Sequence, residues 1–195
     1  MIKITFSRYF ILLLISTITI SNSALQAQTL KLNPKTFVMS IFGTSTLHDF
    51  QSKVTQATGE LVVNDAKQVQ SFSIEIPVKS IKSNEKLMDT KTWDTFHADK
   101  FPTISFKSTE VNNLQVAGSD VNVTVTGNMT MAGCTKKVTL KSVGKMVKPG
   151  VYQFKGSIAL KITDFKMTPP VMLIVKVGDA ITLKYDLTLE GTPIN

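Results

Sequence analysis

Hydrophobic and polar residues alternate over most of this chain with the two-residue period of β-strands. Phe72, Ile74, Ile76 and Val78 follow one another at every second position, with polar or charged residues at most positions between them. This pattern predicts a strand with one apolar face. The same alternation predicts further strands, among them residues 36–63, 103–109, 113–117, 121–131, 152–162 and 181–189.

Short turns separate these predicted strands. Gly133 and Gly150 lie in the segments Ala-Gly-Cys-Thr (132–135) and Lys-Pro-Gly (148–150), and residues 64–67 read Asn-Asp-Ala-Lys. Glycine, proline, asparagine and aspartate favour tight turns. Many short strands joined by such turns specify an all-β fold built on an antiparallel sheet that either curls or closes into a barrel.

One segment has a helical period instead. Met88, Thr92 and Phe96 stand four residues apart, and Trp93 lies on the adjoining row. This spacing predicts a short helical insert around residues 84–99 with one face of large apolar side chains.

The predicted helix has recognisable ends. Ser83 or Asn84 is expected to cap its start, and Pro102 excludes a helix beyond Phe101. The apolar face either belongs to the core or forms a lid over one end of the barrel.

The first 27 residues have the pattern of a secretory signal peptide. Lys3 and Arg8 precede an apolar run that is too short to span a bilayer, and small residues end at Ala27. Cleavage is expected after Ala27, with Ala24 as the less favourable site. The mature protein is therefore expected to be exported, either to a periplasm or to the outside, with no transmembrane segment.

Residues 28–195 have the length of a single domain. The full chain has a net charge of +8, but Arg8 is its only arginine and the lysines are scattered along the predicted strands. Nucleic-acid binding is not expected, because it commonly uses clustered arginine. Transient contact with an anionic membrane surface is compatible with this charge, and so is homodimerisation. Cys134 is the only cysteine, which excludes an intrachain disulfide.

The residues that enzymes use are scarce. His48 and Asp49 are neighbours, so on a strand their side chains point to opposite faces. Asp94 and His97 stand three apart on the helical segment, which leaves a hydrolase or isomerase as an alternative. Two histidines and one cysteine without metal-ligand spacing predict no metal site. We therefore expect a protein that is not an enzyme and needs no cofactor.

The interior of the predicted barrel is apolar, and it either is packed with side chains or holds one ligand. Long apolar chains suit such a lumen because they need no polar partner. We assume that the apolar face of each strand points inward. The predicted lumen residues are Phe72, Ile74, Ile76, Phe106, Val123, Val125, Met129, Met131, Phe154, Leu160, Leu183, Tyr185 and Leu187. The predicted residues at the mouth are Trp93, Phe96 and Phe101.

Several segments resemble the YceI-like family of exported lipid-binding proteins. Their order and spacing along the chain are more specific than any one of them. They are GTSTLHDF (43–50), KFPTISFKS (100–108), VTGNMTMAGCTK (125–136), ITDF (162–165), VGD (177–179) and ITL (181–183). The chain departs from the family at Ala132, where many members have histidine, and at Ile162 and Thr163, where many have Asn-Arg.

The resemblance implies an eight-stranded antiparallel, lipocalin-like barrel with a helical region beside its mouth. It also implies a carrier that holds a polyisoprenoid or similar amphiphile, such as an isoprenoid quinone or a fatty-acid-like lipid. The alternative is a barrel without a ligand that acts as a structural or stress-related interaction protein.

Overall fold

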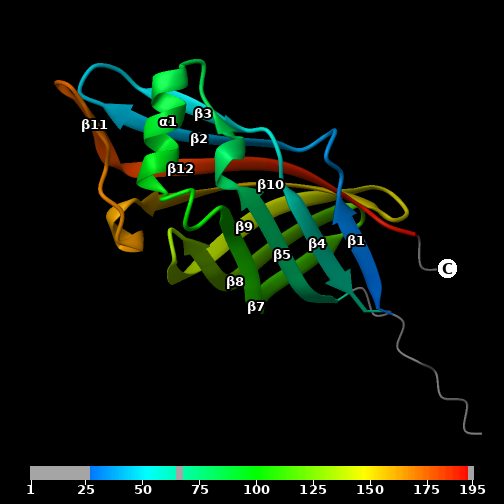
Figure 1. Ribbon diagram of the computed structural model, residues 1–195. Helices are drawn as coiled ribbons and strands as arrows, with labels where there is room; N and C mark the ends of the chain where they lie inside the picture. Colours follow the sequence, from blue (N-terminus) through cyan, green and yellow to red (C-terminus); the bar gives the residue numbers. More distant parts are fainter. Residues whose placement is uncertain (1–26, 65–67, 193–195) are drawn as a thin grey trace, which may run out of the picture.

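The computed structural model describes residues 27–64 and 68–192, which form mainly β-strands with one α-helix, α1 (Figure 1). The predicted turn at 64–67 lies largely outside these residues, and so does the signal peptide, which stays a prediction. The strands are β1 (Gln28–Leu32), β2 (Val38–Ser45), β3 (Phe50–Val54), β4 (Thr58–Val63), β5 (Val69–Pro77), β6 (Ile81–Lys82), β7 (Thr103–Ala117), β8 (Asp120–Met131), β9 (Cys134–Lys148), β10 (Val151–Lys161), β11 (Val171–Met172) and β12 (Val175–Glu190). The helical elements are η1 (Val78–Ser80), α1 (Lys86–Thr95) and η2 (Thr163–Phe165).

The sheet closes on itself, which confirms the predicted eight-stranded antiparallel barrel. Its ring runs β1-β4-β5-β7-β8-β9-β10-β12. The last strand returns to the first through the pairs Lys31 with Glu190 and Leu32 with Leu189. Closure pairs the strand edges within the molecule.

Further strands extend the ring beside β12. Residues 177–186 of β12 pair with β2, β2 pairs with β3, and β3 pairs with β6. These strands lengthen the barrel toward α1, so the end with the helix is built differently from the end where β12 meets β1 (Figure 1). We call this the helix end of the barrel.

The sequence prediction was wrong about residues 103–117, which form one strand rather than two. The register of β7 with β8 shifts between Ser108 and Glu110 and again between Val111 and Asn113. Each shift is a β-bulge, which moves the alternation of side chains out of step without ending the strand. A prediction that requires a strict two-residue period therefore divides the strand in two at the bulges.

The predicted turn between β8 and β9 is a two-residue hairpin turn. Met131 pairs with Cys134, which leaves Ala132 and Gly133 as the central residues. Both have positive φ angles, 47° and 74°. Glycine adopts this backbone without cost, whereas alanine does not.

Strands β9 and β10 separate toward the helix end. Their backbone pairing ends at Ser142 with Gly156, and the η2 turn packs beside both strands beyond that point. Phe165 in η2 is only 1% exposed. The turn beside the diverging strands therefore contributes a buried aromatic ring to the core.

Helix α1 covers part of the helix end, and its position agrees with the predicted insert (Figure 1). The predicted cap was wrong, because the first residue before the helix is Glu85, which makes no side-chain capping bond. Ser83 instead donates its backbone N–H and its hydroxyl to the Asp89 carboxylate, at 2.6 and 2.8 Å. This link ties the first turns of α1 to the strand that leads into it. Within the described chain, no helix is long and apolar enough to cross a bilayer.

Candidate functional site

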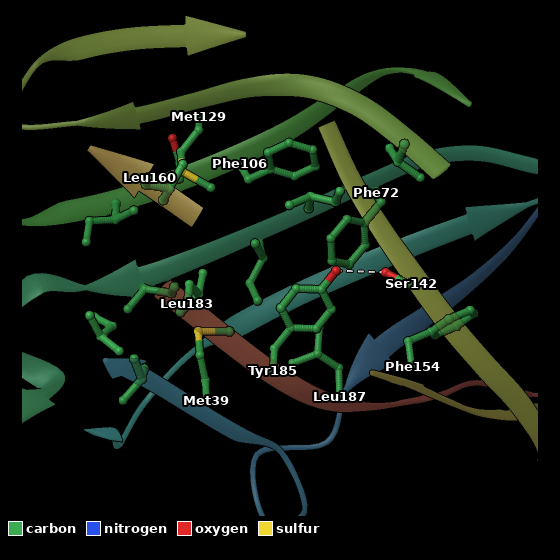
Figure 2. A pocket seen from close by; sticks show the side chains of 18 of the residues that line it. Met39, Phe72, Phe106, Met129, Ser142, Phe154, Leu160, Leu183, Tyr185 and Leu187 are labelled. Atoms are coloured by element: carbon green, nitrogen blue, oxygen red, sulfur yellow. Dashed lines mark hydrogen bonds between the residues drawn. The ribbon is translucent and has the colours of Figure 1, made fainter. Parts of the chain in front are cut away.

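The barrel encloses an apolar cavity, which Figure 2 shows from close by. Side chains from every strand of the ring except β1 line it, and almost none of the lining is polar. The free space is small, with a cavity volume of about 100 Å³. The lumen is therefore largely filled by its own side chains, with a small apolar cavity between them.

All of the predicted lumen residues line this cavity. Alternation places them together because the pleat sends every second side chain to the same face of a strand. The lining also includes residues that the sequence analysis did not name. They are Met39, Ile41, Val54, Leu61, Val69, Ile81, Ile104, Ser105, Leu140, Ser142, Ile181 and Leu189.

Some of these missed residues continue an alternation that was already visible. Ile104 lies two positions before Phe106, and Leu189 lies two positions after Leu187. Ser142 lacked such a signal, because a serine within an alternating strand is expected on the solvent face.

The three predicted mouth residues have different environments. Phe96 is buried and lines the cavity. Trp93 does not line it: its indole N–H donates to the Ile81 carbonyl at 3.1 Å, and the Lys82 ammonium lies 4.0 Å from the ring centroid. Trp93 therefore anchors α1 to β6, and Phe96 is the residue through which the helical segment reaches the lumen.

Phe101, the third mouth residue, also lies outside the cavity lining. Its ring packs against Gly133 in the β8–β9 turn, where a Cβ in place of the glycine hydrogen would lie 2.5 Å from the ring carbon Cζ. The contact joins the segment after α1 to that hairpin. Phe101 therefore has a structural role at the helix end and does not form part of the cavity wall.

One polar pair interrupts the apolar wall. The Tyr185 phenol on β12 and the Ser142 hydroxyl on β9 share a hydrogen bond of 2.8 Å (Figure 2). Burial raises the pKa of Tyr185 above its ordinary value of 10.0, and the bond to Ser142 opposes this shift. The phenol is therefore neutral at physiological pH and can donate or accept a hydrogen bond inside the lumen.

Glycines make room for the aromatic rings of the lumen. Gly144 faces Phe154 directly across β9 and β10, and a Cβ on it would lie 2.6 Å from the ring carbon Cε1. A Cβ on Gly127 would lie 2.5 Å from the Phe106 carbon Cζ. The rings therefore lie against bare backbone at the wall, which leaves the cavity open.

The described residues offer little catalytic geometry. His97 donates its backbone N–H to the Asp94 carbonyl at 3.0 Å, and both residues are exposed. Within residues 27–64 and 68–192, no group of three or more histidine, cysteine or acidic residues is placed to hold a metal ion.

Comparisons with known proteins agree on one family. The family model described as the YceI-like domain matches residues 19–189. A UPF0312 protein of Pseudomonas aeruginosa (strain LESB58) is 36% identical over 99 residues, which cover 47% of this chain and 49% of that protein. The match thus spans about half the length of this curated relative.

Solved structures share the fold at low sequence identity. Burkholderia cenocepacia BcnA aligns with a TM-score of 0.67 and 20% identity, covering 80% of this chain and 98% of that chain. A polyisoprenoid binding domain from Saccharophagus degradans, implicated in plant cell wall breakdown, aligns with a TM-score of 0.66 and 10% identity, covering 86% and 99%. The Campylobacter jejuni YCEI protein aligns with a TM-score of 0.58 and 19% identity, covering 73% and 85%. Since the family model spans most of the sequence, the chain belongs to the YceI-like family.

Proposed function

We propose that this protein is an exported carrier that holds one long-chain isoprenoid or similar amphiphilic lipid in its barrel lumen. The observation that carries the proposal is the apolar cavity, in whose lining the polar side chains are Ser105, Ser142 and Tyr185. Burial of each CH₂ group contributes about 0.8 kcal/mol without a polar partner. A long hydrocarbon chain therefore gains affinity along the whole lumen.

The small volume of the cavity means that the lumen must widen to admit a lipid. Drug-sized ligand pockets typically have volumes of about 300–1,000 Å³, whereas the space reachable here is about 100 Å³. Unbranched Met39, Met129 and Met131 line the cavity and change conformation readily. Binding of a lipid is expected to move such side chains toward the wall.

The Saccharophagus degradans domain, described as polyisoprenoid binding, supports the ligand class through its shared fold. Export is proposed from the signal-peptide pattern of residues 1–27. A carrier that binds and releases its ligand unchanged needs no catalytic group.

The small cavity volume also favours one alternative. In this alternative the barrel binds no ligand and acts as a structural or stress-related interaction protein. Native mass spectrometry of protein purified from its exported compartment, followed by organic extraction, separates the two. A discrete added mass that extracts as a prenyl or acyl lipid supports the carrier. A bare protein mass, unchanged after incubation with isoprenoid quinones and fatty acids, supports the alternative.

A further inference from the structure

The turn between β11 and β12 exposes aliphatic side chains almost completely. Leu173 is 98% exposed and Ile174 is 90% exposed, and Val171 on the same hairpin is 55% exposed. Scattered surface leucines are ordinary, but neighbouring apolar residues that protrude together mark interaction sites.

A second turn adds to this surface. Leu47, in the turn between β2 and β3, is 72% exposed. Its neighbour Thr46 donates its N–H to the Lys176 carbonyl at 2.9 Å, and the Lys176 N–H donates to the Thr46 hydroxyl at 3.1 Å. These bonds hold the two turns together at the helix end of the barrel (Figure 1). We call Leu47, Val171, Leu173 and Ile174 the apolar tip.

Folding does not explain why leucine occupies position 173. Its φ angle is 56°, in the left-handed region that glycine and asparagine adopt more readily. Its side chain gains nothing from burial, since it is 98% exposed. A polar residue that tolerates the left-handed backbone would therefore make this turn more stable in water than leucine does.

We propose that the apolar tip inserts into the interface of a membrane that contains anionic phospholipids. A protein partner would need a pocket shaped to this protrusion, whereas a fluid hydrocarbon layer accepts it without shape complementarity. Lys176 is exposed at the base of the hairpin, and residues 28–195 keep a net charge of +6, since the predicted signal peptide contains only Lys3 and Arg8 as charged residues. Asp49 in the β2–β3 turn has the opposite sign, so the charge of the whole molecule supplies the attraction.

The proposal does not depend on what the lumen holds. Docking by the tip would bring the helix end of the barrel toward the lipid surface (Figure 1). Exchange of a poorly soluble molecule between membrane and protein then would not require passage through water.

Flotation with vesicles tests the proposal on the purified protein. The vesicles are phosphatidylcholine alone, or phosphatidylcholine with about 30% phosphatidylglycerol. The test variant is Leu173→Asn with Ile174→Ser, because asparagine tolerates the left-handed backbone and keeps the turn. The control variant is Val143→Ser with Val147→Ser, which removes exposed apolar side chains from the second half of β9.

We expect the wild type and the control to float with the anionic vesicles, and binding of the tip variant to fall at least tenfold. Circular dichroism and thermal unfolding show whether each variant is folded. Ile174→Trp reports insertion, since lipids with brominated chains should quench its fluorescence more than that of Val143→Trp. Absent or equal binding to the two vesicle types would overturn the proposal, as would full binding by the tip variant. Loss of a concentration-dependent dimer in the tip variant would also overturn it, by assigning the tip to a second copy.

Discussion

Tyr185 directly faces Gly156 across the β10–β12 pair, and its ring lies against that glycine with its hydroxyl bonded to Ser142 on the next strand. A Cβ on Gly156 would lie 2.5 Å from the Tyr185 carbon Cζ and 2.7 Å from the Lys141 carbonyl oxygen. One glycine therefore allows a large phenol to lie at the wall of the lumen, close to where β9 and β10 separate.

Replacing Gly156 with alanine should destabilise the barrel by about 1–3 kcal/mol, the usual cost of overpacking a tight site. The new methyl group collides with backbone as well as with the tyrosine ring, so a rotamer change alone cannot relieve it. Urea unfolding measures this cost. Alanine at Gly118 is the comparison, since a Cβ there meets nothing within 4 Å and only the positive φ of 62° opposes it. Equal free energies of unfolding for Gly156→Ala and the wild type would contradict this packing.

The hydrogen bond between Tyr185 and Ser142 should appear in a double-mutant cycle. Tyr185→Phe or Ser142→Ala alone leaves one half-buried hydroxyl without its partner, which costs about 1–3 kcal/mol. The double variant has no orphaned hydroxyl, so it should cost less than the sum of the single variants. Strict additivity of the three unfolding free energies would show that the bond is unimportant in solution.

Stability at alkaline pH should depend on Tyr185. Burial raises the pKa of its phenol above 10.0, so at pH values just above 10 the unfolded chain loses this proton before the folded chain does. The stabilisation is fully present below the unfolded pKa and is lost as pH rises through the folded pKa. Tyr185→Phe lacks this dependence, so the stability difference between wild type and variant should shrink from about pH 9 to pH 11. A pH-independent difference would contradict the assignment.

The β8–β9 turn should become more stable when Ala132 is replaced with asparagine. Ala132 has a φ of 47° in a two-residue turn, where asparagine followed by glycine is preferred. We expect a gain of about 1 kcal/mol in the free energy of unfolding, because the left-handed backbone costs alanine roughly 1–2 kcal/mol and costs asparagine less. Ala159→Asn is the control, because Ala159 is exposed within β10 and the same change should destabilise a strand there. A loss of stability in Ala132→Asn would refute the strain assigned to this turn.

Alternation predicted the lumen residues well because the lining is set by the pleat of single strands, as with Phe72 and Tyr185. It failed where geometry depends on a neighbouring strand. The bulges of β7 appear only in its register with β8, and the hydrogen-bond partner of the inward-facing Ser142 comes from β12.

The helical segment shows the same limit. The helical period of the sequence correctly predicted the position of α1 and the location of Phe96 at the lumen. The separate roles of Trp93 and Phe101 come from contacts with Ile81 and Gly133, which no spacing within residues 84–99 could indicate. Contacts between residues far apart in the sequence therefore determine the roles of these side chains, which local periodicity could not predict.

A bulky side chain placed in the lumen shows whether the lumen holds the lipid. Leu160 lines the cavity, whereas its neighbour Ala159 on β10 is exposed. The measurement is the amount of prenyl or acyl lipid extracted per folded chain from wild type, Leu160→Trp and Ala159→Trp, each saturated with the same isoprenoid quinone. We expect at least a tenfold loss for Leu160→Trp and wild-type occupancy for Ala159→Trp. Equal occupancy in all three proteins would place the lipid outside the barrel and contradict binding in the lumen.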